Sequence, residues 1–305
     1  MMKPIFIYLF LLCSSIYSVN ACDVCGCSSG ASYMGILPQF SKNVVGIRYR
    51  YRVFEHNNSA ASSTTTGMAL EDRFQTFDIW TRLYLGKRWM LFGFLPYSYY
   101  TRIETDATEH IQSVGDMSAQ LNYLAINTGD STGKKVRQTL ILGAGIKLPT
   151  GKYQQRDRFK NMFPLPFQIG SGAYTLRANI IYTVRVKALG WNNDIAYNYN
   201  LSNELEYKLG NQFTWASTFF YWKKWVNISI LPNAGVFFEQ MSKDREYGYY
   251  NQATGGKALF FTLGTDLYYK NFILGATAQV VGPQNTGIDQ PISKWRFMAQ
   301  CSYLF

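Results

Sequence analysis

The chain has 305 residues and a formal net charge of +11, from 30 Lys and Arg against 19 Asp and Glu. Aromatic residues make up 17% of it, hydrophobic residues 47% and charged residues 16%, which excludes a disordered chain and a bundle of Leu- and Ile-rich membrane helices. The length fits a single domain, because β-barrels commonly exceed about 200 residues as one unit.

The N-terminus has the features of a secretory signal peptide. Lys3 precedes an apolar run over residues 5–12, and Val19-Asn20-Ala21 is a small-residue cleavage site. Beyond Ala21, no apolar stretch reaches the roughly 18 residues that a membrane-spanning helix needs. The expected organisation is a signal peptide over 1–21, a Cys-containing periplasmic tail over 22–43 and an outer-membrane β-barrel over 44–305.

From residue 44 onward, apolar and polar residues alternate with the two-residue period of half-buried β-strands. In the first segment Arg48, Arg50 and Arg52 share one face, opposite an apolar and aromatic face. Segments with this pattern are 44–54, 73–86, 88–101, 113–128, 136–148, 172–186, 188–200, 207–222, 225–238, 257–269, 271–283 and 294–305. They are mostly 11–16 residues long. Soluble strands are typically about 5–6 residues, whereas a tilted membrane strand needs about 9–11.

The connections between these segments alternate in length. Long links at 55–72, 102–112, 149–171, 201–206, 239–256 and 284–293 alternate with short turns around 86–87, 128–135, 186–187, 223–224 and 270. Outer-membrane barrels have short periplasmic turns, long external loops and an even strand number. The sequence therefore predicts an all-β fold, a transmembrane antiparallel up-and-down β-barrel of about twelve strands in the outer membrane of a Gram-negative bacterium.

Two further features agree with a membrane barrel. The last segment alternates up to Phe305, and a terminal aromatic residue closing such a strand resembles the C-terminal signal of bacterial outer-membrane barrels. The short turns are rich in Lys, which either contacts anionic phospholipid heads or is simply solvated. Aromatic residues expected in the interfacial girdles are Trp89, Tyr99, Trp191, Trp222, Trp225 and Trp295.

Three local motifs lie at strand ends. Val114-Gly115-Asp116-Met117 opens one strand, Gly145-Ile146-Lys147-Leu148-Pro149-Thr150-Gly151 closes the next, and Gly170-Ser171-Gly172 precedes another. In order and spacing they resemble the meta-pathway phenol degradation family of outer-membrane channel proteins, over roughly residues 44–305. The resemblance implies a transporter-like β-barrel that passes small, often hydrophobic compounds across the outer membrane.

The inward faces of the predicted strands carry charge. The candidate lumen and permeation residues are Arg48, Arg50, Arg52, Arg82, Lys147, Arg177, Arg185 and Arg296, opposed by Asp78, Asp116, Asp194 and Asp266. One interpretation is a basic lumen that selects anionic or polar solutes. The other is that Arg and Asp pair across a narrow interior and close it.

Three cysteines, Cys22, Cys25 and Cys27, lie in the predicted mature N-terminal tail. They could hold a soft metal ion such as Cu(I) or Zn(II), form a local disulfide, or include a lipid-modified first residue, or the tail could be disordered. Three thiolates without a His are too few for a closed zinc site. No other metal or cofactor is expected. Cys301 falls at a predicted lipid-facing strand position.

The sequence contains few features that would support an enzymatic activity or nucleic-acid binding. His56 and His110 are the two histidines of the chain, and both fall in predicted external loops, where solvated surface positions are expected. No G-x-S-x-G, H-E-x-x-H or phosphate-binding glycine motif occurs. The Lys and Arg residues are spread over turns and strand faces rather than gathered in one patch, so no nucleic-acid partner is predicted.

Two hypotheses follow. The first is an outer-membrane channel for passive uptake or efflux of small solutes, hydrophobic or anionic, and not an enzyme. The second is a structural or tethering barrel whose Cys tail binds a metal or a periplasmic partner. In either case the expected partners are outer-membrane lipids, and a monomer is favoured.

Overall fold

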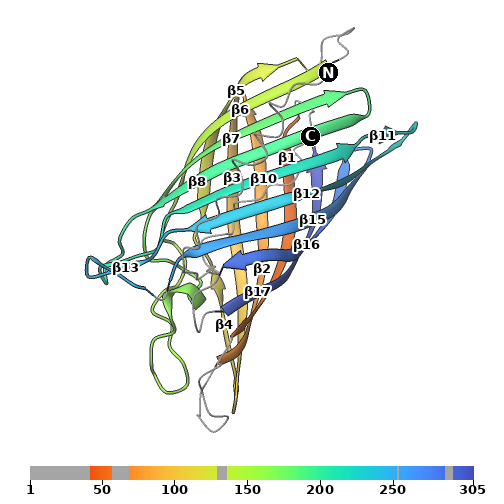
Figure 1. Ribbon diagram of the computed structural model, residues 1–305. Coiled ribbons are helices and arrows are strands. Elements are labelled where there is room, and N and C mark those ends of the chain that lie inside the picture. The colour runs from red at the N-terminus through yellow and green to blue at the C-terminus, as the bar shows by residue number, and fades with distance from the viewer. Residues whose placement is uncertain (1–41, 57–68, 129–135, 253, 286–290) are drawn as a thin grey trace, which may run out of the picture.

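The computed structural model describes residues 42–56, 69–128, 136–252, 254–285 and 291–305. Most of them lie in long antiparallel strands (Figure 1). The wall strands are β1 (Val44–His56), β2 (Ala69–Leu85), β3 (Trp89–Glu104), β4 (Thr108–Val114), β5 (Ser118–Asn127), β6 (Val136–Lys147), β7 (Thr175–Val186), β8 (Leu189–Asn200), β10 (Gln212–Tyr221), β12 (Ile228–Met241), β15 (Gly256–Tyr269), β16 (Phe272–Asn285) and β17 (Pro291–Leu304). The short elements are η2 (Leu165–Phe167), β9 (Tyr207–Lys208), β11 (Lys223–Lys224), β13 (Arg245–Glu246) and β14 (Tyr249–Tyr250). Within the described residues, no helix has the length and apolarity to cross a membrane.

The wall closes on itself. Each strand pairs with its sequence neighbours, and β1 pairs with both β2 and β17. β4 and β5 both pair with β3, one after the other, so they form one strand interrupted at residues 115–117. Counted this way, the described chain forms a closed barrel of 12 antiparallel strands, which confirms the predicted fold class.

Several predicted boundaries are wrong. The link expected at 102–112 is mostly strand, because β3 continues to Glu104 and β4 starts at Thr108. The turn expected at Lys223-Lys224 lies at 225–227, because those two lysines pair with the start of β12. Residues Tyr207 and Lys208 belong to a separate three-stranded sheet with β13 and β14 rather than to the wall.

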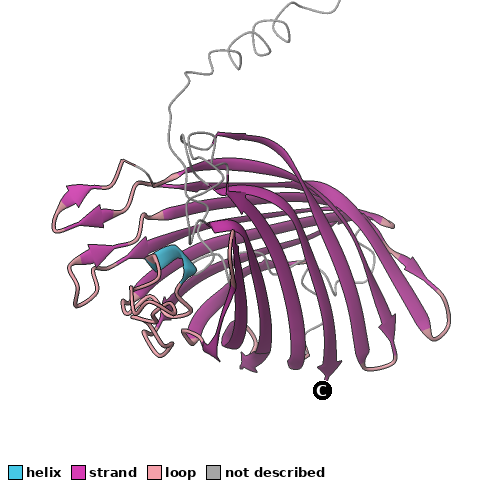
Figure 2. Ribbon diagram, turned by 90° about the horizontal axis from the view of Figure 1, so that it is seen from below, coloured by secondary structure: helices cyan, strands magenta, loops and turns pink. Residues whose placement is uncertain are grey.

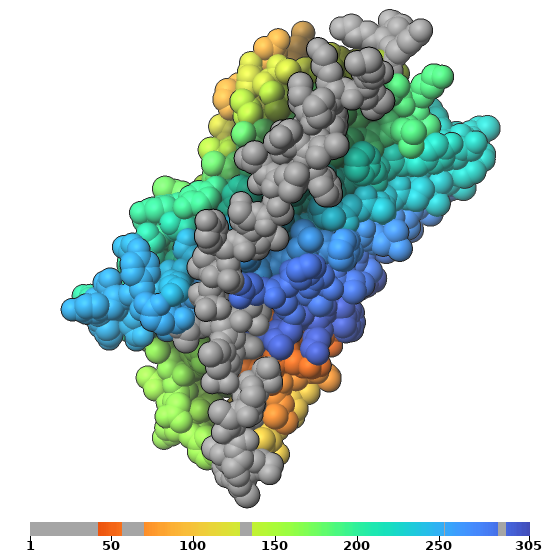
Figure 3. All heavy atoms as spheres, viewed as in Figure 1, coloured from red at the N-terminus to blue at the C-terminus, as the bar shows by residue number. Residues whose placement is uncertain are grey.

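The outer surface of the wall is apolar. Exposed apolar side chains occur on strands around the barrel and include Ile47 on β1 (57% exposed), Phe219 on β10 (63%) and Leu263 on β15 (69%); such a surface would be costly in water and suits a lipid environment. The expected girdle residue Trp222 is an exception, because it stacks on Tyr268 and packs against the interior. The hairpin of β13 and β14 projects beyond the barrel at the end that carries the long loops (Figure 3).

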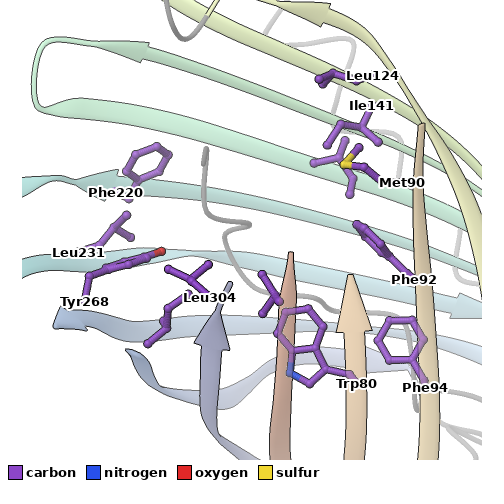
Figure 4. Close-up of a cluster of buried hydrophobic side chains, with 13 residues drawn as sticks. Trp80, Met90, Phe92, Phe94, Leu124, Ile141, Phe220, Leu231, Tyr268 and Leu304 are labelled. Atoms are coloured by element: carbon purple, nitrogen blue, oxygen red, sulfur yellow. The ribbon is translucent and has the colours of Figure 1, made fainter. Parts of the chain in front are cut away.

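The interior has three layers along the barrel axis. We call the two ends the short-turn end, predicted to be periplasmic, and the long-loop end, predicted to be external. Near the short-turn end lies an apolar layer, shown in Figure 4, of Val44, Trp80, Met90, Phe92, Phe94, Leu124, Ile141, Ile181, Phe220, Leu231, Tyr268, Ile273 and Leu304. Nearer the long-loop end lies a second apolar layer of Phe54, Phe74, Tyr100, Ile111, Phe163, Phe167, Ile169, Ala216, Phe237, Ala258 and Phe260. Charged and amide side chains, including Arg48, Asp78, Asn122 and Asp194, face inward between the two layers.

Candidate functional site: the charged barrel interior

The predicted lumen residues do face inward. Arg48, Arg52, Asp78, Arg82, Asp116, Asp194, Asp266 and Arg296 are buried, and Arg50, Lys147, Arg177 and Arg185 are half-buried. They do not form one ring. Instead they separate into groups held by different contacts, and their role in permeation stays a prediction.

The first group joins β1 to β2. Arg48 lies directly opposite Asp78 in the register, and its Nε donates to Asp78 Oδ2 at 3.1 Å. Arg50 Nη2 donates to Asp78 Oδ1 at 2.8 Å, so one carboxylate accepts from two guanidinium groups. Arg52 is the third member of the ladder, and its guanidinium lies 5.5 Å from the centre of the Phe74 ring. These ion pairs run along the wall, so this part of the cluster does not close the interior by pairing across it.

One ion pair does cross the interior. Arg296 on β17 makes two hydrogen bonds to Glu239 on β12, at 3.0 and 2.5 Å, although β15 and β16 separate the two strands in the wall. The Arg296 guanidinium also lies 3.8 Å from the centre of the Phe260 ring. Gln300, also on β17, donates a hydrogen bond to Asp266 on β15 at 3.1 Å. The ion pair of Arg296 with Glu239 joins two strands of the wall that are not neighbours, and it narrows the interior.

The loop between β6 and β7, residues 148–174, folds into the barrel. Phe163, Phe167 and Ile169 are 4%, 1% and 3% exposed and belong to the apolar layer near the long-loop end. The short 3₁₀ helix η2, drawn in cyan in Figure 2, carries Phe167. The Arg102 guanidinium lies 4.4 Å from the centre of that ring. The loop narrows the opening at the long-loop end.

A buried carboxylate holds this loop in place. Asp116 lies in the interruption between β4 and β5 and accepts hydrogen bonds from Gly151 N (2.9 Å), Ser171 N (3.0 Å), Ser171 Oγ (2.6 Å) and Lys147 Nζ (3.0 Å). The three motifs singled out in the sequence thus meet at one point, since each supplies a partner. We call this group, with Gly115 and Gly170, the Asp116 cluster.

Two glycines allow the backbones of the Asp116 cluster to approach each other. A Cβ built on Gly170 would lie 2.3 Å from the carbonyl oxygen of Gly151, and one on Gly151 would lie 2.8 Å from the Cα of Gly170. Both contacts are with backbone atoms that cannot move aside. A side chain at either position would therefore separate the two ends of the inward loop.

A cavity lies beside the Asp116 cluster, and residues of β1, β2, β3, β5, β6, β7 and β8 line it. It contains about 810 Å³ of empty space, part of it continuous with solvent. Its lining includes Arg50, Arg52, Asp78, Asp116, Lys147 and Arg177, together with Phe94, Pro96, Ser98, Tyr100, Gly115, Gln120, Ile146, Ile169 and Asn198. Arg48, Arg82, Arg185, Asp194, Asp266 and Arg296 lie outside this lining. The structure therefore brings six of the twelve predicted lumen residues together around one cavity.

The sequence prediction missed three interior residues. Arg102 makes two hydrogen bonds to Asp72, at 2.8 and 2.7 Å, and Glu239 pairs with Arg296 as described above. Asp72, Arg102 and Glu239 each lie one residue beyond a predicted strand boundary. Because the strands are longer than expected, these residues point into the barrel instead of belonging to external links.

The histidines also differ from expectation. Both lie in strands rather than in loops. His56 Nε2 lies 2.8 Å from Asp72 Oδ2 and the residue is half-buried, so it is not a solvated surface group. His110 is exposed on β4, where its ring stacks on Tyr99.

A second buried carboxylate orders the loops at the long-loop end. Asp244 accepts hydrogen bonds from Tyr207 Oη (2.5 Å) and Gly210 N (2.6 Å), while its own backbone N–H donates to Thr254 Oγ1 at 2.8 Å. Burial raises the pKa of the Asp244 carboxyl, and the hydrogen bond from Tyr207 partly offsets this shift.

Metal binding at the N-terminal tail is untested, because Cys22, Cys25 and Cys27 lie outside the described residues, as does the predicted signal peptide. Among the residues that the structure describes, no group of three or more His, Cys, Asp or Glu side chains is arranged to hold a metal ion. Cys301 is an exposed free thiol on the outer face of β17.

No family model and no curated protein matches the sequence, so the resemblance to the phenol degradation family stays a prediction. Solved structures do match the fold. The COG4313 outer membrane channel from Pseudomonas putida F1 superimposes with a TM-score of 0.65 at 13% identity, covering 88% of this chain and 97% of that one. The β domain of the Bordetella autotransporter BrkA superimposes with a TM-score of 0.51 at 13% identity, covering 87% and 100%. The closed wall, its apolar outer surface and these likenesses show that the chain has the fold of an outer-membrane β-barrel.

Proposed function

We propose that this barrel is a narrow channel through which small solutes cross the outer membrane passively. The observation that supports it is the interior cavity, which lies inside the membrane-spanning wall, is partly continuous with solvent and is lined with charged and polar groups. A barrel that served only as a scaffold would have no need to keep charged side chains around an internal space, because their burial is costly.

The two apolar layers restrict what passes. In the part of the chain that the structure describes, the layer near the short-turn end and the inward loop near the long-loop end narrow the interior on both sides of the cavity. Small hydrophobic or anionic solutes fit this interior best, because apolar layers flank a cavity with basic groups. Passage in either direction is compatible with this arrangement.

The outer surface and the closure of the wall indicate the partners of the proposed channel. Outer-membrane lipids cover the apolar outer face. The pairing of β1 with β17 closes the sheet within one chain and leaves no strand edge for a second copy, which supports a monomer. We propose that the barrel is a channel and not an enzyme, as the sequence analysis expects.

The experiment is single-channel recording of the purified full-length protein in planar bilayers. We expect small conductance steps with a preference for anions, and we expect Arg52→Gln to shift the preference toward cations. Arg88→Gln, which removes an exposed arginine at the short-turn end, is the matched control and should leave selectivity unchanged. A folded protein without conductance would refute the channel and favour the tethering role of the Cys tail.

A further inference from the structure

A row of two cationic and two aromatic side chains lies at the long-loop end of the barrel. Arg245 on β13 lies directly opposite Lys208 on β9 and directly opposite Tyr250 on β14. Residues that are directly opposite on neighbouring strands point to the same side of a sheet, so these three share one face. The Lys208 ammonium group lies 4.2 Å from the centre of the Tyr199 ring on β8. We call Tyr199, Lys208, Arg245 and Tyr250 the rim row.

Tyr199 shows which way the rim row faces. Its side chain is 41% exposed, whereas its neighbours Asn198 and Asn200 are buried inside the barrel, so Tyr199 points outward from the wall. Tyr197, the preceding outward residue of β8, is exposed as well. Figure 1 shows β13 beyond the ends of β8 and β12. The rim row therefore continues the lipid-facing surface where the wall ends, at the level where rings with a polar edge meet lipid headgroups.

The carboxylates of the small sheet lie on its other face. Glu246 is opposite Tyr207 on β9 and opposite Tyr249 on β14, one residue along each strand from the rim row. Asp244 accepts a hydrogen bond from the Tyr207 hydroxyl on that same face. Because successive residues of a strand point to opposite faces, the sheet separates its charges, with carboxylates on one face and cations on the other.

The two cations of the rim row are oriented but not neutralised. None of the ion pairs among the described residues includes Lys208 or Arg245. Glu206, which precedes β9, lies in a turn with φ 55° and does not pair with Lys208. On the outer face of β2, by contrast, Arg73 is paired with Glu71. Like charges directly opposite each other destabilise a sheet, and an anion shared by Lys208 and Arg245 would relieve their repulsion.

The contacts of Arg245 favour a phosphate as that anion. Its guanidinium group donates to the Tyr250 hydroxyl and lies 4.3 Å from the centre of the Tyr250 ring, which fixes its position and leaves its charge available. An oriented guanidinium beside an ammonium group matches the oxygens of a phosphate, which accept charge-assisted hydrogen bonds from both.

From this geometry we infer that the rim row is a docking site for the phosphate group of a glycolipid of the outer leaflet, the lipid A part of lipopolysaccharide. Basic clusters beside a lipid-facing surface commonly bind anionic headgroups in this way. The inference goes beyond the channel and requires no transport. It does require that the long-loop end is external, as the sequence predicts.

The test is native mass spectrometry of the full-length protein in a neutral detergent, titrated with three probes. They are lipid A, lipid A from which the phosphates have been removed, and inorganic phosphate. We expect lipid A to bind about tenfold or more tightly than its dephosphorylated form, the effect of a charge-assisted hydrogen bond. Arg245→Gln and Lys208→Gln should each weaken lipid A binding by a similar factor. Arg245→Lys should retain part of the affinity, because the charge remains.

Matched variants separate a binding role from damage to the fold. Arg73→Gln removes an outer-face arginine that Glu71 already neutralises, and it should leave lipid A binding unchanged. Tyr249→Ala changes the opposite face of the same hairpin and should also leave it unchanged. Equal affinities for lipid A with and without phosphates, or equal effects of Arg245→Gln and Arg73→Gln, would overturn the inference. Inorganic phosphate that binds as tightly as lipid A would indicate a site for free anions and would overturn it too.

The outcome is independent of conductance. A barrel that binds lipid A through the rim row but does not conduct keeps the inference and refutes the channel. A conducting barrel whose lipid A binding is the same in Arg245→Gln and Lys208→Gln as in the parent does the reverse. An inverted topology would place the rim row at the inner leaflet and overturn the assignment to lipid A.

Discussion

The Asp116 cluster predicts how firmly the inward loop is held. In Asp116→Asn the side chain keeps its shape but loses its charge, and an amide group replaces one of the two acceptor oxygens. Lys147 and two backbone N–H groups of the loop then lose a buried anionic partner. Removing one member of a buried ion pair costs about 3–5 kcal/mol, which shifts the equilibrium between the inward and the released loop by a factor of roughly 100 to 4000.

The assay is the reaction of a reporter cysteine with a water-soluble maleimide. Ile169→Cys places the thiol on the loop at a position that is 3% exposed, in a background whose native cysteines are serine. When opening and closing are faster than labelling, the labelling rate follows the open population. The rate should therefore rise by about two orders of magnitude or more when Asp116→Asn is added.

The control is Asp157→Asn on the same loop. Asp157 is half-buried and accepts from nearby residues of the loop, Phe159 N and Asn161 N, both at 2.8 Å, so the change should leave the labelling rate unchanged. If Asp116→Asn and Asp157→Asn label at the same rate as the parent, apolar packing alone holds the loop, and the role assigned to Asp116 is wrong.

Three further predictions concern topology, stability and pH. Tyr249→Cys, at a position 82% exposed on the projecting hairpin, should react with an impermeant maleimide on intact cells, whereas Lys187→Cys in a short turn should not, and the opposite pattern would invert the barrel. Glu239→Gln leaves the buried Arg296 without its anionic partner and should cost about 3–5 kcal/mol, seen as a lower thermal unfolding midpoint of the folded barrel. Burial raises the pKa of Asp244, so the folded loop binds the carboxyl proton more tightly than the unfolded chain does. The stability of the loop should therefore be greatest at or below the ordinary carboxyl pKa of about 4. It should fall as the pH rises through the raised pKa. Hydrogen-exchange protection of the loop amides, corrected for intrinsic rates, should show this trend, and Asp244→Asn should abolish it.

The sequence was sufficient for the wall but not for the ends of the strands. Inside the bilayer, outward residues contact lipid and must be apolar, whereas inward residues face the barrel interior and can be polar. The sequence therefore alternates with a two-residue period that can be recognised. Beyond the bilayer the outward positions become polar, as at Glu71 and Arg73, which pair on the outer face of β2. The alternation of hydrophobicity then disappears although the strand continues, which is why Asp72 and Arg102 were assigned to links.

The inward loop could not be predicted for a different reason. Asp116, Lys147 and the three motifs were recognised, but the partners of Asp116 come from a segment without periodicity, whose path depends on contacts distant in sequence. One signal was present: residues 163–169 read Phe-Pro-Leu-Pro-Phe-Gln-Ile, an apolar run in a loop expected to face water. Such a run is costly in solvent and favours burial inside the barrel.

The two apolar layers differ in how they can open. The layer near the short-turn end, including Trp80 and Phe92, is carried by strands paired on both sides, so it can widen only through rotations of its side chains. The layer near the long-loop end contains Phe163 and Phe167, which lie on a loop held by side-chain contacts, those of Asp116 and the ion pairs of Arg158 with Asp106 and Glu104. Moving that loop breaks no strand pairing. In the proposed channel, entry is therefore controlled at the long-loop end, and the fixed layer near the short-turn end limits the size of the solute that can leave the cavity.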